Sequence, residues 1–250
     1  MAERIPYYHD LLEAFSEPGC ALCRLLAVSA DKLVDSILYE GVNDPPTREK
    51  LNAARGYCTS HAELLIRAGA ALGVTIMMDG ILKVLLRTVA ANPVDQPGAS
   101  RTRGLMRRVN SNISHPGQKL VTDLSPQAEC PICINEAEML GHYGQTLRQY
   151  LAPDNELVQT YTHSDGLCLA HFRYVLGAGL PGPALTALIT AQQAIWQRLH
   201  EQSEEFIRKN DHRFRGEPFG VEEDVWRRSL AAISGAPLRN YVKSKGLTQS

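Results

Sequence analysis

The chain has 250 residues, of which 44% are hydrophobic and 21% are charged, so it can bury a core of its own and has the composition of an ordinary soluble globular protein. Its formal net charge of −1 excludes a global electrostatic attraction to nucleic acid or to an anionic membrane. The N-terminus lacks the apolar core of a secretory signal, and the most apolar stretch, residues 71–91, carries Asp79, Lys83 and Arg87. We therefore expect a soluble, cytoplasmic protein with no membrane association.

Hydrophobic periodicity and turn residues predict an all-α protein. The expected helices cover residues 7–15, 20–40, 47–54, 58–68, 74–91, 130–151, 156–161, 168–176, 183–209 and 221–234. Residues 93–127 differ in character, because they are rich in turn-forming and polar residues and begin with Pro93. A stretch of this length without clear structure is unusual inside a compact domain, so we predict a linker there.

All six cysteines belong to a motif that occurs twice. Each copy has a C-x-x-C pair, then 34 intervening residues, then a C-x-x-H pair, and the second copy lies 110 residues after the first. The first copy comprises Cys20, Cys23, Cys58 and His61, and the second comprises Cys130, Cys133, Cys168 and His171. In a reducing compartment such spaced cysteines are more often metal ligands or catalytic thiols than disulfides.

The spacing suits a tetrahedral metal ion. Two ligands three residues apart at the start of a helix project to the same side, and each of the four pairs stands at a predicted helix start. Residues 41–56 are long enough to return the chain along the preceding helix, so we expect each copy to close its own Cys3His site. Zinc is the first choice of metal. An iron–sulfur cluster is the main alternative, thiol–disulfide chemistry is the next, and a structural disulfide is the last.

The duplication predicts the domain organisation. Residues 1–92 form the first metal-binding repeat, 93–127 the linker, 128–216 the second repeat, and 217–250 a C-terminal helix and tail.

Two basic clusters fall outside the metal motifs. One spans Arg101 to Arg108, and the other comprises Arg208, Lys209, His212, Arg213 and Arg215, with Phe206 and Phe214 among them. Phosphate contacts and base stacking would suit the second cluster, although cations are also common at helix C-termini. We keep nucleic-acid binding as an alternative. No nucleotide-binding, nucleophile-elbow or metalloprotease motif is found, and no residue is identified as catalytic.

Three stretches together resemble a known family. They are Cys130-Pro131-Ile132-Cys133, residues 166–173 around Cys168 and His171, and residues 206–218. They are similar to an uncharacterised bacterial family, catalogued as a domain of unknown function, with duplicated C-x-x-C and C-x-x-H pairs. The resemblance implies a bacterial cytoplasmic protein and brings no activity with it. The first copy departs from the family pattern, since Ala21 stands where proline is expected after the first cysteine.

We therefore expect two pseudo-repeated helical units, each organised on a Cys3His zinc site, followed by a C-terminal helix. Four-ligand sites without an open position are usually structural. The leading hypothesis is accordingly a metal-stabilised binding or regulatory module that contacts another macromolecule. An iron–sulfur or thiol redox protein and a nucleic-acid-binding protein are the alternatives.

Overall fold

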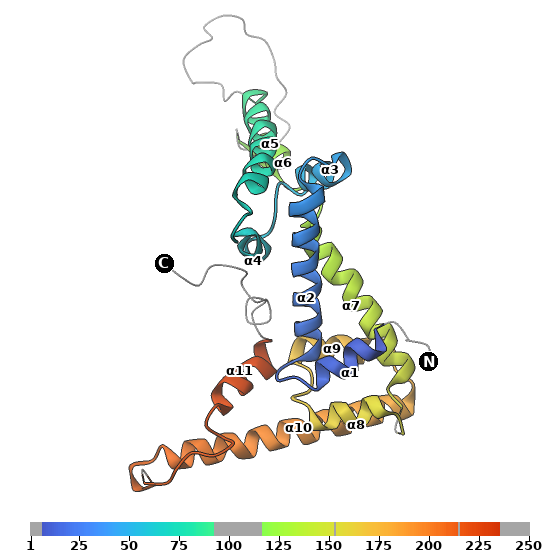
Figure 1. Cartoon of the computed structure of the whole chain (residues 1–250), viewed down its shortest axis with the longest axis vertical. Helices are drawn as coiled ribbons and strands as arrows, with labels where there is room; N and C mark the ends of the chain where they lie inside the picture. The colour runs from blue at the N-terminus through green and yellow to red at the C-terminus, as the bar shows by residue number, and fades with distance from the viewer. Residues whose placement is uncertain (1–6, 93–116, 153, 215, 236–250) are drawn as a thin grey trace, which may run out of the picture. The chain divides into compact units, whose positions relative to one another are not determined.

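The protein is described by a computed structural model that covers residues 7–92, 117–152, 154–214 and 216–235 (Figure 1). Every regular element in these ranges is helical, which confirms the predicted all-α class. The α-helices are α1 (Tyr8–Phe15), α2 (Ala21–Ser36), α3 (Pro45–Ala53), α4 (Thr59–Ala62), α5 (Ala71–Ala90), α6 (Gln118–Leu124), α7 (Pro131–Tyr150), α8 (Glu156–His163), α9 (Leu169–Gly177), α10 (Gly182–Lys209) and α11 (Val225–Ser234). A π-helical turn, Ile37–Gly41, extends α2, and 3-10 turns occupy Glu63–Leu65 and His212–Phe214.

The chain divides into two compact units that cut across the predicted repeats. The first unit combines Met1–Leu33 with Asn135–Thr248, and the second is built from Val34–Ile134. Helix α2 begins in the first unit and ends in the second, and α7 begins in the second and ends in the first. Each unit therefore contains sequence from both copies of the motif.

The predicted linker contains one helix that the sequence analysis missed. Helix α6 lies within the range 93–127, and the segment that follows it is tied to the end of α3, because the backbone N–H of Gln127 donates to the carbonyl of Ala53 (2.8 Å). Its seven residues are too short for a clear periodic pattern. The other part of the predicted linker, residues 93–116, and the basic cluster Arg101–Arg108 lie outside the described residues.

In the first unit, α8 and α11 pack against α10, and α1 packs against α8 (Figure 1). Aromatic pairs join these helices. The rings of Phe15 and Tyr161 meet edge to face with centroids 5.0 Å apart, and Phe172 and Trp196 do so at 5.2 Å. This core includes the three cysteines of the unit, Cys20, Cys23 and Cys168, so their positions are fixed by packing as well as by any bound ion.

In the second unit, α3 and α6 pack against α5. The contact between α3 and α5 depends on Gly80, because the guanidinium of Arg48 lies directly against it and would collide with any Cβ there. Arg48 also donates a hydrogen bond to the carbonyl of Ile76 (3.0 Å). Without Arg48, this carbonyl would accept only the backbone hydrogen bond inside α5. The glycine thus permits a close approach between a charged side chain and a helix backbone.

No helix within the described ranges combines the length and the apolar composition needed to cross a bilayer.

Candidate metal centres

The eight predicted ligands gather into two groups of four, but each group takes one pair from each copy. Cluster A consists of Cys20, Cys23, Cys168 and His171, and cluster B consists of Cys58, His61, Cys130 and Cys133. In both clusters the four ligand atoms lie within 4.8 Å of one another. The expectation that each copy closes its own site is therefore wrong, although both clusters have the expected three cysteines and one histidine.

The length of α2 explains the exchange of partners. This helix and its π-helical extension run from Ala21 to Gly41, and at about 1.5 Å per residue they carry the chain about 30 Å from Cys20. Helix α3 then stays in the second unit instead of returning, so Cys58 and His61 meet the C-x-x-C pair at the start of α7. Each cluster consequently lies wholly within one unit.

In cluster A the Nδ1 atom of His171 stands at the centre of the contacts. It lies 3.3 Å from Cys20 Sγ, 3.4 Å from Cys23 Sγ and 3.3 Å from Cys168 Sγ. The sulfurs of Cys23 and Cys168 are 3.8 Å apart, far beyond the length of a disulfide bond. The four atoms surround a space the size of one ion.

Cluster B repeats this geometry. Nδ1 of His61 lies 3.2 Å from Cys58 Sγ, 3.6 Å from Cys130 Sγ and 3.3 Å from Cys133 Sγ. The sulfurs of Cys58 and Cys133 are 3.7 Å apart. The two clusters thus reach the same arrangement although their flanking sequences differ. A requirement to coordinate the same kind of ion would select this shared arrangement.

Helix starts present the ligands in both clusters. Cys58 and Cys168 are the N-cap residues of α4 and α9, with nearly identical extended backbones (φ −67°, ψ 162° and φ −67°, ψ 160°). A glycine with positive φ precedes each of them by two residues, Gly56 at 108° and Gly166 at 72°. Because L-residues rarely adopt these angles, glycine at these positions lets the chain turn sharply into the ligand pair.

Cluster A is braced by polar side chains that the sequence analysis did not identify. A carboxylate oxygen of Asp165 accepts from the backbone N–H of Gly19 (2.7 Å), linking the turns that precede the two ligand pairs. Fully buried Gln192 accepts from the N–H of Leu167 (3.1 Å) and from the hydroxyl of Tyr161. The sequence does carry a signal for this brace, namely a glutamine on the apolar face of the helix predicted at residues 183–209. A buried polar side chain needs a specific hydrogen-bond partner, so this glutamine indicates a polar contact in the core.

Cluster B has a different brace between its own two turns. Arg55, which has a positive φ of 56°, donates from Nη2 to the carbonyl of Asp123 (3.0 Å) and from Nη1 to that of Asn52 (2.9 Å). Together with the bond from Gln127 to Ala53, this holds the segment before Cys58 against the segment before Cys130.

The thiols in each cluster influence one another's ionisation. In cluster A, hydrogen bonds from Cys20 and Cys23 lower the pKa of Cys168. In cluster B, burial opposes ionisation of Cys130, yet the N–H groups of Cys58 and Cys133 lower its pKa to about 7. Burial and the neighbouring Cys58 thiol raise the pKa of Cys133 to about 12. The pKa of Cys130 thus falls while that of its neighbour Cys133 rises, and a cation bound between these two sulfurs would favour the thiolate form of both.

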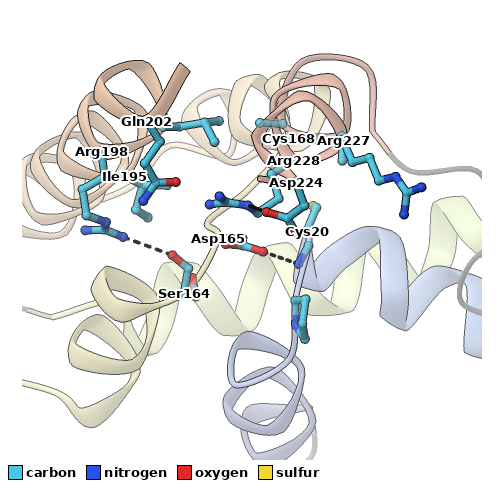
Figure 2. Close-up of a pocket in the computed structure, with 15 residues that line it drawn as sticks. Cys20, Ser164, Asp165, Cys168, Ile195, Arg198, Gln202, Asp224, Arg227 and Arg228 are labelled. Atoms are coloured by element: carbon cyan, nitrogen blue, oxygen red, sulfur yellow. Dashed lines mark hydrogen bonds and ion pairs between the residues drawn. The ribbon is translucent and has the colours of Figure 1, made fainter. Parts of the chain in front are cut away.

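A pocket of ≈ 280 Å³ adjoins cluster A between α10 and α11 (Figure 2). Cys20 and Cys168 line it, yet they are only 4% and 1% exposed. Figure 2 shows Arg198 and Arg228 among the residues that line this pocket, and both guanidinium groups donate hydrogen bonds to neighbouring residues. Arg198 donates to the carbonyls of Thr162 and Ser164, and Arg228 donates to Asp224 (2.7 Å). Two arginines of the pocket wall are therefore held by hydrogen bonds, Arg198 to the end of α8 and Arg228 to the start of its own helix α11.

The second predicted basic cluster is largely neutralised by ion pairs. Arg208 pairs with Glu205 and Glu217, and Lys209 pairs with Glu222 (2.6 Å). Arg213 pairs with Asp211 in the same way, and Arg215 lies outside the described residues. This pairing does not favour phosphate contacts, and nucleic-acid binding stays a prediction.

Comparisons with known proteins support the resemblance that the motifs indicated. A protein of Caldicellulosiruptor sp. (strain Rt8B.4), described as an uncharacterized 23.9 kDa protein in the xynA 3' region, is 22% identical over 226 residues, which cover 90% of this chain and 99% of that protein. No solved structure matches the chain. The family model described as "Family of unknown function (DUF6062)" matches residues 1–239. The match spans both clusters and all the described helices, and the chain belongs to this family of unknown function.

Proposed function

We propose that this protein binds two zinc ions, one in each cluster, and that the ions hold the two helical units in the form that engages a macromolecular partner. The metal part of the proposal rests on the distances between the ligand atoms. Ligands at the corners of a tetrahedral zinc site, with Zn–S of about 2.3 Å and Zn–N of about 2.0 Å, lie about 3.8 Å apart between sulfurs and about 3.5 Å apart between sulfur and nitrogen. The separation between sulfurs is 3.8 Å for Cys23 and Cys168 and 3.7 Å for Cys58 and Cys133, the separations between sulfur and nitrogen are 3.2 to 3.6 Å, and all the ligand atoms of a cluster lie within 4.8 Å of one another.

The same spacing argues for one ion per cluster instead of an iron–sulfur centre. In a [4Fe–4S] cluster each cysteine binds a different iron, and the inorganic core lies between the ligands. Ligand atoms within 4.8 Å of one another leave no room for such a core. Three thiolates and one imidazole are ligands that zinc accepts readily, and four protein ligands leave no open position for substrate. Both clusters thus have the ligand set of a closed, non-catalytic zinc site.

Exposed apolar side chains support the partner-binding part of the proposal. Trp226, Leu230 and Ile233 are spaced four and three residues apart on α11 and are 54%, 61% and 65% exposed. This spacing places them on one face of the helix, as in helices that insert into a groove of another protein. A comparable exposed row on α5 comprises Leu82, Leu86 and Val89.

Metal analysis tests the first part. Protein purified under reducing conditions without chelators should contain about two zinc ions per chain, lack visible absorbance, and lose helicity when a strong chelator is added, because binding energy at such sites is also folding energy. Less than one metal ion per chain would overturn the proposal. A brown protein with iron and a visible absorbance band would replace zinc with an iron–sulfur centre.

Site-directed crosslinking tests the second part. A photo-crosslinking residue at Leu230 should give a discrete adduct with one protein in intact cells. The same residue at Gln193, an exposed polar position on α10, should not. Equal adduct patterns at both positions would show that the α11 face is not a specific docking surface.

A further inference from the structure

The two clusters share their ligand types but differ in how far their sulfurs are shielded. In cluster A all three cysteines are buried, with 4% of Cys20, 9% of Cys23 and 1% of Cys168 exposed. In cluster B, Cys58 and Cys133 are both partly exposed. Ligand exchange at a zinc–thiolate site begins where an incoming ligand or a competing metal can reach a bound sulfur, so this difference bears directly on the rate at which an ion leaves.

The C-terminal end of α11 covers cluster A. Gly235, the residue at which the helix ends, faces the cluster, because a Cβ on it would be in ordinary van der Waals contact with Cys23 Sγ (3.4 Å) and Cys168 Sγ (3.6 Å). Its backbone angles, φ 76° and ψ 165°, belong to a region that essentially only glycine occupies. The residue both terminates α11 and places the end of this helix beside two sulfurs of cluster A.

Polar contacts away from the cluster hold α11 in this position. The segment before the helix is anchored by Glu222, which is 4% exposed, pairs with Lys209 (2.6 Å) and accepts from the N–H of Gly220 (2.9 Å). Farther along, the hydroxyls of Ser203 on α10 and Ser229 on α11 lie 3.3 Å apart. The cover is thus a fastened helix, and its fastening does not depend on the metal ligands.

We infer that cluster B is an exchangeable site for a thiophilic divalent cation, whereas cluster A retains its ion beneath α11. This inference rests on the proposed function, because it presumes that both clusters bind an ion. It assigns them separate roles. The ion of cluster A maintains the fold of its unit, and the ion of cluster B equilibrates with the cation supply, so that occupancy of the second unit reports metal availability.

Competitive release of zinc tests the assignment. The protein loaded with two zinc ions is mixed with the chromogenic chelator 4-(2-pyridylazo)resorcinol, and release is followed by absorbance. Two phases of equal amplitude are expected, with rates that differ about tenfold or more, equivalent to a difference of about 1.4 kcal/mol or more between the activation free energies. Cys133→Ser should remove the fast phase, and Cys23→Ser should remove the slow phase.

A pair of glycine variants tests the cover itself. Gly235→Ala should accelerate the slow phase several-fold and leave the fast phase unchanged, because alanine cannot hold this backbone against the sulfurs. Gly179→Ala is the matched control, since Gly179 has a similar φ of 71° but has no atom within 4 Å of its Cβ position. Glu222→Gln offers a second route to the same result, because it loosens the anchor of α11 without altering the residue next to the sulfurs.

The outcomes separate the two proposals. Absence of bound metal would overturn the proposed function itself. Two zinc ions released in a single phase would leave the proposed function standing and overturn the inference. Slow-phase rates that respond equally to Gly235→Ala and Gly179→Ala, with no response to Glu222→Gln, would also overturn it, because α11 would then not control release.

Discussion

Asp165 and Gly19 are 146 residues apart in the sequence, and the carboxylate of the first accepts a hydrogen bond of 2.7 Å from the backbone N–H of the second. Each residue belongs to the turn that precedes one ligand pair of cluster A. The bond therefore fixes the distance between two pairs that come from different copies of the motif. Residues that orient metal ligands in this way typically contribute strongly to metal affinity.

Removing this acceptor should weaken cluster A selectively. Asp165→Ala should lower zinc affinity at cluster A about 10- to 100-fold, the range found when partners that orient metal ligands are replaced. Asp165→Asn keeps a side-chain oxygen at the same position and should stay within a few-fold of the parent protein. Competition titration with a chelator of known affinity measures both. Equal affinities for the alanine and parent proteins would show that the turn is held by other contacts.

Pairs of cysteine substitutions can distinguish the observed grouping from a local one. Cys20→Ser with Cys168→Ser removes two ligands from cluster A only, so about one zinc ion per chain should remain. Cys20→Ser with Cys58→Ser removes one ligand from each cluster, so stoichiometric binding should be lost at both. If each copy closed its own site, the two results would be reversed. Metal content per chain, measured by mass spectrometry after desalting, decides between them.

The ion pair between Lys209 and Glu222 predicts an unusual acid titration. The hydrogen bond from Lys209, supported by the N–H of Gly220, lowers the pKa of Glu222 to about 2. Because this pKa lies below that of an unfolded glutamate, the pair stabilises the fold above the ordinary glutamate range, and its contribution is lost as the pH falls towards 2. Carboxyl carbon shifts in nuclear magnetic resonance spectra measure the titration. In Lys209→Met the pKa of Glu222 should rise towards its usual value, and an unchanged pKa would contradict the assigned cause.

Two helix-interior glycines should respond to alanine in opposite directions. Gly141 in α7 has no atom within 4 Å of its Cβ position, so Gly141→Ala should stabilise the protein by about 0.5 to 1 kcal/mol through helix propensity. Gly80→Ala gains the same propensity but displaces the Arg48 guanidinium from the carbonyl of Ile76, and loss of this hydrogen bond to a charged group should leave the variant less stable by about 1 kcal/mol. Chemical unfolding of both variants in the zinc-loaded state measures the difference. Stabilisation by Gly80→Ala would mean that Arg48 moves aside freely.

The residue types that form the two clusters were predictable because the motif that supplies them is local. A pair of ligands three residues apart, such as Cys168 and His171, needs only one helix start, and the two copies share identical spacing. The glycines before Cys58 and Cys168 were equally visible as breaks, and the structure gives both a positive φ. Local steric requirements of this kind are written into a few adjacent residues.

The partition of ligands between the clusters was not predictable from spacing. The 16 residues 41–56 can span the length of α2 if they are extended, so return and departure were both geometrically allowed. The choice depends on long-range packing, including the contact between α3 and α5 that Arg48 and Gly80 permit.

Amphipathic periodicity had a similar limit for α11. It predicted a helix over residues 221–234, but it did not show that small residues such as Ala231 would line the pocket while Trp226 and Ile233 stay exposed.

The exchange of partners between copies also determines the order in which the sites can close during synthesis. Chains emerge from the ribosome N-terminus first, so Cys23 must wait for Cys168, 145 residues later. Over much of that interval, the ligands already synthesised are those of the first copy alone, and they form a complete Cys3His set. A metal ion captured at that stage would hold the wrong pairs together, and the finished fold would require its release before Cys23 can meet Cys168.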